Sequence, residues 1–384
     1  MSFEDSAEYI AKAKNLFTIG AAFTTNTSKG HDFFDISTHT LVALNTRTTG
    51  YSFLDKSLNG GYSNKTLVVL MGGPKTGKSM WLCNLAAQSV KNGYNTLYIT
   101  LELPYQKVSQ RIGANMFNIP MAQYNETIKD NNLFAKKVQE FRTNQLGKLG
   151  TFILEEFPTS TATAEMIEAF AIKKQEEISA LTGKDFKFDN VYIDYLNIMR
   201  DMKNPNSENT YLKIKSICED VRAMAQRNEW CVISVTQTNR GGTESSDLNM
   251  TDVSESAGLT ATVDALFGII RTTMMRAEGC YYLKAVAMRD SPLMGCKKRY
   301  TFNDTYLRLA EDLTEEIIAD GVDIPSIYVS ATANGVAKYQ QNNRGYNNQT
   351  PQQPAPIQQG TPLIQTPQLG ISESQLTGAD LFKM

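Results

Sequence analysis

The sequence predicts an α/β fold built on a central, mainly parallel sheet, and two observations predict it. Short, continuous apolar runs rich in β-branched residues recur between residues 66 and 270, and such runs suit strands that are buried on both faces. Longer segments with helical periodicity lie between several of these runs. Alternating strands and helices favour a three-layer domain, with helices on both faces of a parallel sheet.

Residues 1–45 are expected to form a linker segment with one short helix. Ser6 is placed to cap this helix. Its apolar face would carry Tyr9, Ile10, Ala13 and Leu16. A helix this short is marginal on its own, so we expect it to pack on its own chain or on a neighbouring one.

Residues 46–312 are expected to form the main domain. Its strands are expected in the runs TLVVLMG (66–72), NTLYITLE (95–102), TFILEEF (151–157), NVYIDYL (190–196), WCVISVTQ (230–237) and DALFGII (264–270). Helices are expected in SMWLCNLAAQSVKNG, which ends at a glycine, and in YLKIKSICEDVRAMAQRN. Residues 281–304 are typical of a hairpin with its turn between Ser291 and Gly295.

The C-terminal part of the chain differs in composition. Residues 313–330 are expected to extend the main domain, whereas 331–384 are rich in Gln, Asn and Pro, which predicts a disordered tail. The stretch 374–384, SQLTGADLFKM, is either a docking peptide on a flexible tether or a disordered end with incidental apolar residues. The anchors of a docking peptide would be Leu376, Leu381, Phe382 and Met384.

Composition argues against several classes of protein. The formal net charge of -2 excludes a general cationic coat, so nucleic-acid binding must come from local loops. The five cysteines are scattered without a C-x-x-C pair, which argues against a zinc site and favours a reducing compartment. We therefore expect a cytoplasmic protein, in the host cytoplasm if a phage encodes it. We find neither the apolar region of a signal peptide nor the ~20 apolar residues of a membrane helix.

The stretch GGPKTGKS matches the P-loop pattern G-x-x-x-x-G-K-[ST]. In such a loop, backbone N–H groups converge on phosphate oxygens at the N-terminus of a helix. Lys78 would reach the outer phosphates of ATP, and the Ser79 hydroxyl would ligate Mg²⁺. A chance match in a glycine-rich turn is the alternative, but the strand before the motif and the helix after it favour a P-loop. Its phosphate-binding residues would be Gly72, Gly73, Pro74, Lys75, Thr76, Gly77, Lys78 and Ser79.

Polar residues at three strand ends complete the predicted site. Asp194 would hold Mg²⁺ through the water shell of the ion, as a Walker B residue does, or would simply cap the next helix. Glu102 ends an expected strand adjacent to the P-loop, where it would orient or deprotonate the attacking water, unless it is only a solvated side chain. Gln237 would contact the γ-phosphate or its water, or make only a local hydrogen bond at the strand end.

These segments, in this order, resemble the RecA-type core of the DnaB-like replicative helicases. The resemblance covers most of residues 46–308 and includes LYITLEL, VYIDYL, SVTQTNR, MRD and KKRYTFND. The stretch DVSESAGLTATVD is most similar to the T4-like branch of phage replicative helicases. The resemblance implies a RecA-like P-loop NTPase core that uses ATP and Mg²⁺. It also implies a homohexameric ring that moves 5′ to 3′ on single-stranded DNA and unwinds duplex DNA at the replication fork.

The resemblance also implies roles for single residues. Glu102 would be the catalytic base, Asp194 the Walker B residue and Gln237 the sensor. Arg289 matches the arginine that one subunit inserts into the site of its neighbour, where it neutralises charge developing on the γ-phosphate. Family members usually carry a lysine two positions earlier, where this chain has Ala287. Either one arginine suffices or another cation, such as Lys284, replaces that lysine.

The DNA-contacting loop of the family follows the SVTQTNR segment. The matching residues are Ser254, Glu255, Ser256 and Ala257, with Arg240 and the glycines after it as helpers. Many family members have an arginine where this chain has Ser254, so the phosphate contact is expected to be softer or to use backbone N–H groups. Six weak copies around one strand would add up. The alternative is a polar loop without a DNA contact.

Primase, a helicase loader and other replisome proteins are the partners that the resemblance implies. Residues 1–45 match only the linker before the motor and not the helical domain that commonly meets primase, so ring formation is the firmer expectation. Two other functions stay open from the sequence: a RecA-type recombination or repair ATPase that forms filaments, and a nucleotide-switched assembly protein.

Overall fold

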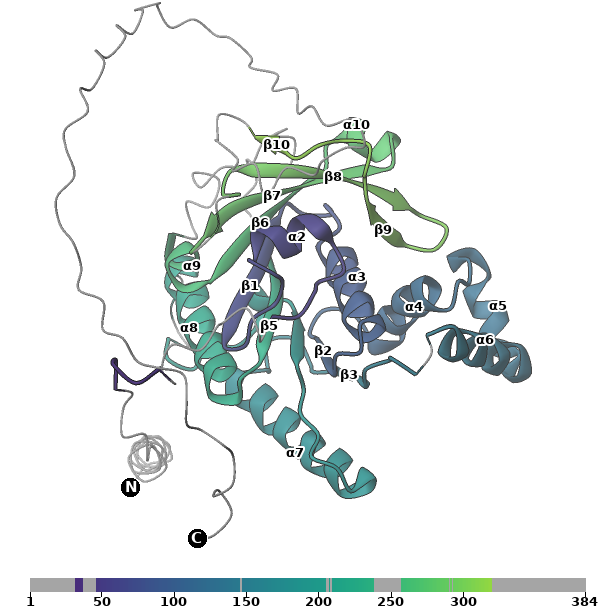
Figure 1. The fold of residues 1–384 in the computed structure, drawn as a ribbon, viewed down its shortest axis with the longest axis horizontal. Helices are drawn as coiled ribbons and strands as arrows, with labels where there is room; N and C mark the ends of the chain where they lie inside the picture. Colours follow the sequence, from purple (N-terminus) through teal and green to yellow (C-terminus); the bar gives the residue numbers. More distant parts are fainter. Residues whose placement is uncertain are drawn as a thin grey trace, which may run out of the picture. The chain divides into compact units, whose positions relative to one another are not determined.

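The computed structural model describes residues 32–36, 46–145, 147–204, 207, 209–237, 257–289, 291 and 293–319. Its strands form a ten-stranded sheet with the order β10-β8-β7-β6-β1-β5-β4-β2-β3, and β9 pairs with β8 (Figure 1). The strands are β1 (Thr66–Gly72), β2 (Thr96–Thr100), β3 (Phe152–Glu156), β4 (Asn190–Asp194), β5 (Cys231–Gln237), β6 (Ala265–Ile270), β7 (Cys280–Met288), β8 (Cys296–Asn303), β9 (Arg308–Glu311) and β10 (Ile318–Ala319).

The sheet has a parallel part and an antiparallel part. Strands β6, β1, β5, β4, β2 and β3 run parallel to their neighbours in that part. Strands β7, β8, β9 and β10 pair in antiparallel fashion beyond β6. The predicted α/β class and the predicted hairpin, now β7 and β8, are therefore confirmed, and β10 joins residues after 312 to the same sheet.

Helices cover both faces of the parallel strands. The helices are α2 (Ser52–Ser57), α3 (Lys78–Lys91), α4 (Tyr105–Met116), α5 (Tyr124–Lys129), α6 (Asn131–Asn144), α7 (Ala164–Thr182), α8 (Thr210–Asn228), α9 (Ala257–Thr262) and α10 (Thr273–Ala277), with 3₁₀ turns η3 (Met121–Gln123) and η4 (Leu196–Ile198). The buried side chains of α2, α3 and α4 join one core, and those of α7, α8 and α9 join the other.

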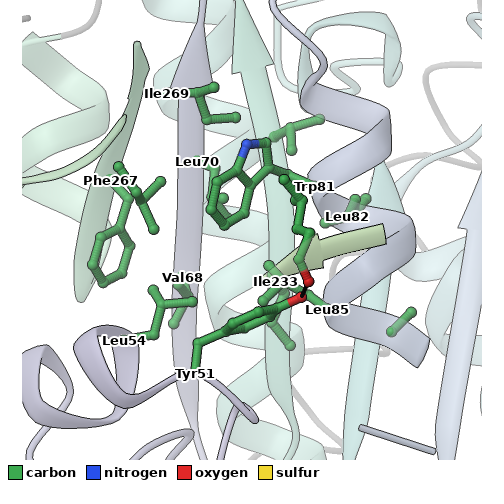
Figure 2. Close-up of a cluster of buried hydrophobic side chains, with 14 of the residues drawn as sticks. Tyr51, Leu54, Val68, Leu70, Trp81, Leu82, Leu85, Ile233, Phe267 and Ile269 are labelled. Carbon is green, nitrogen blue, oxygen red and sulfur yellow. Dashed lines mark hydrogen bonds between the residues drawn. The ribbon is translucent and has the colours of Figure 1, made fainter. Parts of the chain in front are cut away.

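Strand β1 lies between these two cores because its successive side chains point to opposite faces. Val68 and Leu70 belong to the core beneath α3, where Trp81 is fully buried (Figure 2). Leu67 and Val69 belong to the core beneath α8. This double burial explains the continuous apolar run and fixes the position at which β1 delivers the P-loop.

Several expectations fall on residues outside the described ranges. These are the N-terminal helix after Ser6, most of the segment 313–330 and the whole tail 331–384 with its docking peptide. None of the described helices is long and apolar enough to span a bilayer.

Candidate active site

The P-loop connects the end of β1 to the start of α3, as the sequence predicts. Gly77 precedes α3 with a φ of 95°, which side-chain-bearing residues rarely adopt. A Cβ at Gly77 would also lie 2.6 Å from the Tyr281 hydroxyl. The loop is closed on itself, since the Thr76 hydroxyl donates to the Gly73 carbonyl over 2.8 Å. Its conformation therefore presents the first N–H groups of α3 to the space above the sheet.

The Lys78 ammonium lies over this loop and donates to the Gly73 carbonyl over 2.9 Å. Burial lowers the pKa of Lys78, while the charges of Glu102 and Asp194 act in the opposite direction. Lys78 is thus a cation with two carboxylates nearby and a neutral backbone partner, which phosphate oxygens can replace.

Asp194 ends β4 and is fully buried beside the start of α3. One carboxylate oxygen accepts from the Ser79 hydroxyl and the other from the Tyr98 hydroxyl, each over 3.1 Å. Burial raises the pKa of Asp194 to about 6, the two hydroxyls lower it, and the charge of Glu102 raises it further. The carboxylate is therefore held in one orientation toward the P-loop serine.

The predicted strand around Glu102 differs from the structure in two respects. β2 ends at Thr100, so Glu102 lies in the bend that follows. The prediction that this strand is adjacent to the P-loop strand is wrong, because β5 and β4 lie between β1 and β2. Order along the chain does not give order in a doubly wound sheet. Glu102 nevertheless reaches the P-loop region, since the carboxyl ends of parallel strands share one edge.

A cleft of about 380 Å³ gathers the predicted residues at this edge. Its lining is Pro74, Lys75, Gly77, Lys78, Ser79, Met80, Glu102, Leu103, Arg111, Asp194, Tyr195 and Gln237. Gln237 ends β5, and its backbone N–H donates to the Asn197 side chain over 3.2 Å. The strand ends of β1, β2, β4 and β5 therefore contribute to one concave site.

The residues present fit a magnesium ion bound together with nucleotide phosphates. Mg²⁺ prefers oxygen ligands and commonly uses one or two protein groups, with waters and phosphates for the rest. The Ser79 hydroxyl and the Asp194 carboxylate supply such oxygens 3.1 Å apart. Within the described residues, no group of three or more His, Cys, Asp or Glu side chains forms a metal site by itself. This donor set suits an ion that arrives with its nucleotide.

The model of the family described as "DnaB-like helicase C terminal domain" matches residues 47–299. The chain belongs to the DnaB-like helicase family. The DnaB-like replicative helicase of Enterobacteria phage T4 is 30% identical over 269 residues, which are 68% of this chain and 54% of that protein. The replicative DNA helicase DnaB of Rickettsia bellii is 24% identical over 286 residues, covering 71% and 52% of the two chains. The family resemblance inferred from the sequence, including its similarity to phage T4, is confirmed.

Two solved structures share the fold. One is an isolated ATPase domain, with a TM-score of 0.57, 17% identity, and coverage of 78% of this chain and 97% of that one. Another shows a DnaB-like replicative helicase and its interactions with primase, with a TM-score of 0.59, 17% identity, and coverage of 79% and 74%. The RecA-like fold expected of this family is confirmed. The chain spans about half the length of the curated relatives it matches.

Arg289 lies at the opposite edge of the sheet from the P-loop of its own chain. It follows Met288, the last residue of β7, which pairs with the first residue of β6. Its guanidinium forms an ion pair with Asp264 over 3.2 Å, just before β6. The P-loop begins where β1 ends, and a strand of seven residues is about 20 Å long. Arg289 is therefore separated from the cleft by the full length of the parallel strands.

The other expected site residues are only partly described. Lys284, the suggested replacement for the missing family lysine, is 5% exposed within this chain, so it cannot project from the surface in this conformation. Ala287 packs at the margin of the core beneath α8. Ala257 begins α9, and nothing is described of its side chain. The DNA-loop residues Arg240, Ser254, Glu255 and Ser256 lie outside the described residues.

Sequence reasoning missed several groups at the site. Tyr98 lies within the apolar run of β2, where nothing distinguishes it from a core residue. Arg111 lies on α4 and lines the cleft as a further cation. Arg276 donates to the Lys75 carbonyl of the P-loop over 2.7 Å from α10, far along the chain. Of the three, Arg111 alone had a usable signal, since it lies on the helix that directly follows Glu102.

Proposed function

We propose that this chain is the ATP-driven motor of a replicative DNA helicase. It assembles as a homohexameric ring, translocates 5′ to 3′ on single-stranded DNA and separates the duplex at a replication fork. One observation carries the proposal: Lys78, Glu102 and Asp194 share one cleft, while Arg289 lies at the opposite edge of the sheet. A ring brings these two edges of neighbouring subunits together, so that each site is completed in trans.

In this proposal each residue of the cleft has one task. The phosphates of ATP bind the N–H groups of the P-loop residues 72–79, and Lys78 exchanges the Gly73 carbonyl for phosphate oxygens. Ser79 and Asp194 would hold Mg²⁺, which supplies charge neutralisation on the phosphates. Glu102 orients the attacking water and accepts its proton. Arg289 of the next subunit neutralises charge that develops on the γ-phosphate.

Transmission to DNA is assigned to the segment after Gln237. Gln237 stands at the rim of the cleft, and the chain continues from it into the segment with Arg240 and residues 254–257. A contact to the γ-phosphate or its water would thereby be passed to the DNA-binding loop. Since the net charge of -2 gives little long-range attraction, six copies of a weak contact would have to hold the strand together.

The remaining partners are inferred from the relatives. One structural neighbour is a DnaB-like helicase described with its interactions with primase. We extend primase, a loader and other replisome proteins to this chain as candidate partners. The tail peptide 374–384 is the proposed docking segment for a loader. The five buried, unpaired cysteines fit a reducing cytoplasm.

The test is the rate of ATP hydrolysis with and without single-stranded DNA, together with the mass of the native assembly in ATP and magnesium. We expect stimulation by DNA and the mass of six subunits. Stimulation with filaments rather than rings would instead favour a recombinase. A slow rate that DNA does not change would favour a nucleotide-switched assembly protein.

A further inference from the structure

Asp264 binds two arginines at the edge of the sheet where Arg289 lies. Arg222 on α8 contacts it with two nitrogens, Nη2 over 2.8 Å and Nε over 3.3 Å. The Nε of Arg289 lies 3.2 Å from Oδ1, the oxygen that also receives the Nη2 of Arg222. The Leu67 N–H donates to Oδ2 over 2.9 Å, which fixes the carboxylate to the start of β1. One carboxylate thus serves two guanidinium groups and one backbone amide.

The two arginines are held to different degrees. The exposed fraction of the side chain is 17% for Asp264, 24% for Arg222 and 46% for Arg289. Arg222 makes the two-nitrogen contact that carboxylates bind best. The other bonds of the Arg289 side chain reach the carbonyls of Val263 and Ala261 over 3.4 and 3.5 Å, near the limit for a hydrogen bond. Arg289 is therefore the partner of Asp264 that a competing anion would displace.

We propose that Asp264 is a positioning residue that holds Arg289 at rest and competes for it with the nucleotide of the neighbouring subunit. The inference rests on the proposed function, in which Arg289 acts in trans. When the γ-phosphate of the neighbour comes within reach, the guanidinium exchanges one carboxylate oxygen for a phosphate oxygen. Arg222 stays behind and keeps the charge of Asp264 paired, so the exchange leaves no unpaired anion in this half-buried position.

This arrangement sets the apparent affinity of the ring for ATP. A protein whose binding-competent state is only partly populated binds its ligand more weakly by that fraction. While Asp264 occupies Arg289, part of the binding free energy that the arginine offers to ATP is used to break the ion pair. Weakening the pair should tighten ATP binding, and strengthening the pair should weaken it.

Two substitutions move the pair in opposite directions. Asp264→Asn removes the charge but keeps an oxygen for the Leu67 N–H, so we expect the KM for ATP to fall by about threefold to tenfold. We expect kcat to stay within about twofold of the wild type. Arg222→Gln leaves the Asp264 charge to Arg289 alone, so we expect KM to rise by a similar factor. A purely structural role of Asp264 would shift KM in the same direction in both variants.

The experiment measures DNA-stimulated ATP hydrolysis of the full chain, with the thermal midpoint of each variant as a check on folding. Binding of an ATP analogue is then compared for Arg289→Ala with and without Asp264→Asn, and the second substitution should have no effect there. Shifts of KM in one direction only, or an unchanged KM in Asp264→Asn, would overturn the proposal. If Arg289→Ala alone leaves turnover intact, the proposed trans role of Arg289 fails instead, which separates the two outcomes.

Discussion

At the scale of single residues, the cleft gives up some stability in order to bind its ligand. Asp194 is fully buried, and its oxygens accept hydrogen bonds from the neutral hydroxyls of Ser79 and Tyr98. Its pKa is raised to about 6, chiefly by burial, so its charged form is penalised in the folded chain. Nucleotide-bound magnesium would relieve that penalty, which gives the site a reason to recruit the ion.

The first prediction concerns Asp194→Asn in the absence of nucleotide and magnesium. A carboxyl whose pKa is raised in the folded state lowers the free energy of unfolding as the pH rises from about 4 to about 6, and the loss persists above that range. The amide cannot ionise, so the variant should be more stable than the wild type at pH 7.5, by up to about 3 kcal/mol. The gain should shrink toward pH 4.

Chemical denaturation across this pH range checks the prediction, and Asp201→Asn is a matched control. Burial acts to raise the pKa of the Asp201 carboxyl, but hydrogen bonds from Asn204, Ser216 and Lys203 outweigh it and lower that pKa. The control should lose stability at pH 7.5. A gain in Asp194→Asn that does not depend on pH would contradict the account.

The second prediction concerns Glu102→Gln. The amide keeps the size of the side chain but cannot accept a proton, so turnover should fall by about 10²–10⁴-fold while nucleotide binding and assembly survive. Stopped assays of phosphate release together with binding of a fluorescent nucleotide measure the two effects separately. Glu126→Gln on α5, where Glu126 forms an exposed pair with Lys129, is the control and should hydrolyse ATP normally. Normal turnover in Glu102→Gln would remove this residue from catalysis.

At the scale of elements, the sequence predicts what depends on local pattern and misses what depends on sheet order. The continuous apolar run of β1, the P-loop and the start of α3 are correctly predicted because each is written in neighbouring residues. The place of β2 in the sheet is not, since two later strands, β4 and β5, insert between it and β1. Residue types at strand ends still pointed to Glu102, Asp194 and Gln237 as one group, because parallel strands end at one edge.

The third prediction concerns the contact between α3 and the hairpin of β8 and β9. Asn84 on α3 is 2% exposed. Its side chain donates to the Leu307 carbonyl over 3.0 Å and accepts from the Leu309 N–H over 2.9 Å. Asn84→Leu leaves these buried groups unpaired, so we expect a loss of about 2–4 kcal/mol in the free energy of unfolding. Urea denaturation measures it, and Asn144→Leu at the end of α6 should change little.

An unchanged midpoint for Asn84→Leu would show that the helix and the hairpin are not held together by this side chain. The role of Asn84 had no signal in the sequence, because its partners come from strands more than two hundred positions away. The same holds for Arg276, whose contact with the P-loop carbonyl of Lys75 comes from α10.

At the scale of the whole molecule, the two edges of the sheet carry different parts of the proposed site. The edge with the carboxyl ends of β1, β2, β4 and β5 holds the P-loop cleft. The opposite edge holds Arg289 beside Asp264, in a second hollow of about 440 Å³. The family resemblance pointed to Arg289, but only the fold shows that it is remote from its own P-loop. In the proposed mechanism, a chain with this arrangement needs a neighbour to complete its site.

Mixing two inactive variants tests this central claim most directly. Lys78→Ala disables the cleft but keeps Arg289, and Arg289→Ala keeps the cleft but offers no arginine to its neighbour. In equal mixtures that assemble with ATP, magnesium and single-stranded DNA, about one interface in four joins an intact cleft to an intact arginine. We therefore predict that hydrolysis returns on mixing, although each variant alone is inactive. No recovery in mixed rings confirmed by native mass, or full activity of Arg289→Ala alone, would contradict the account.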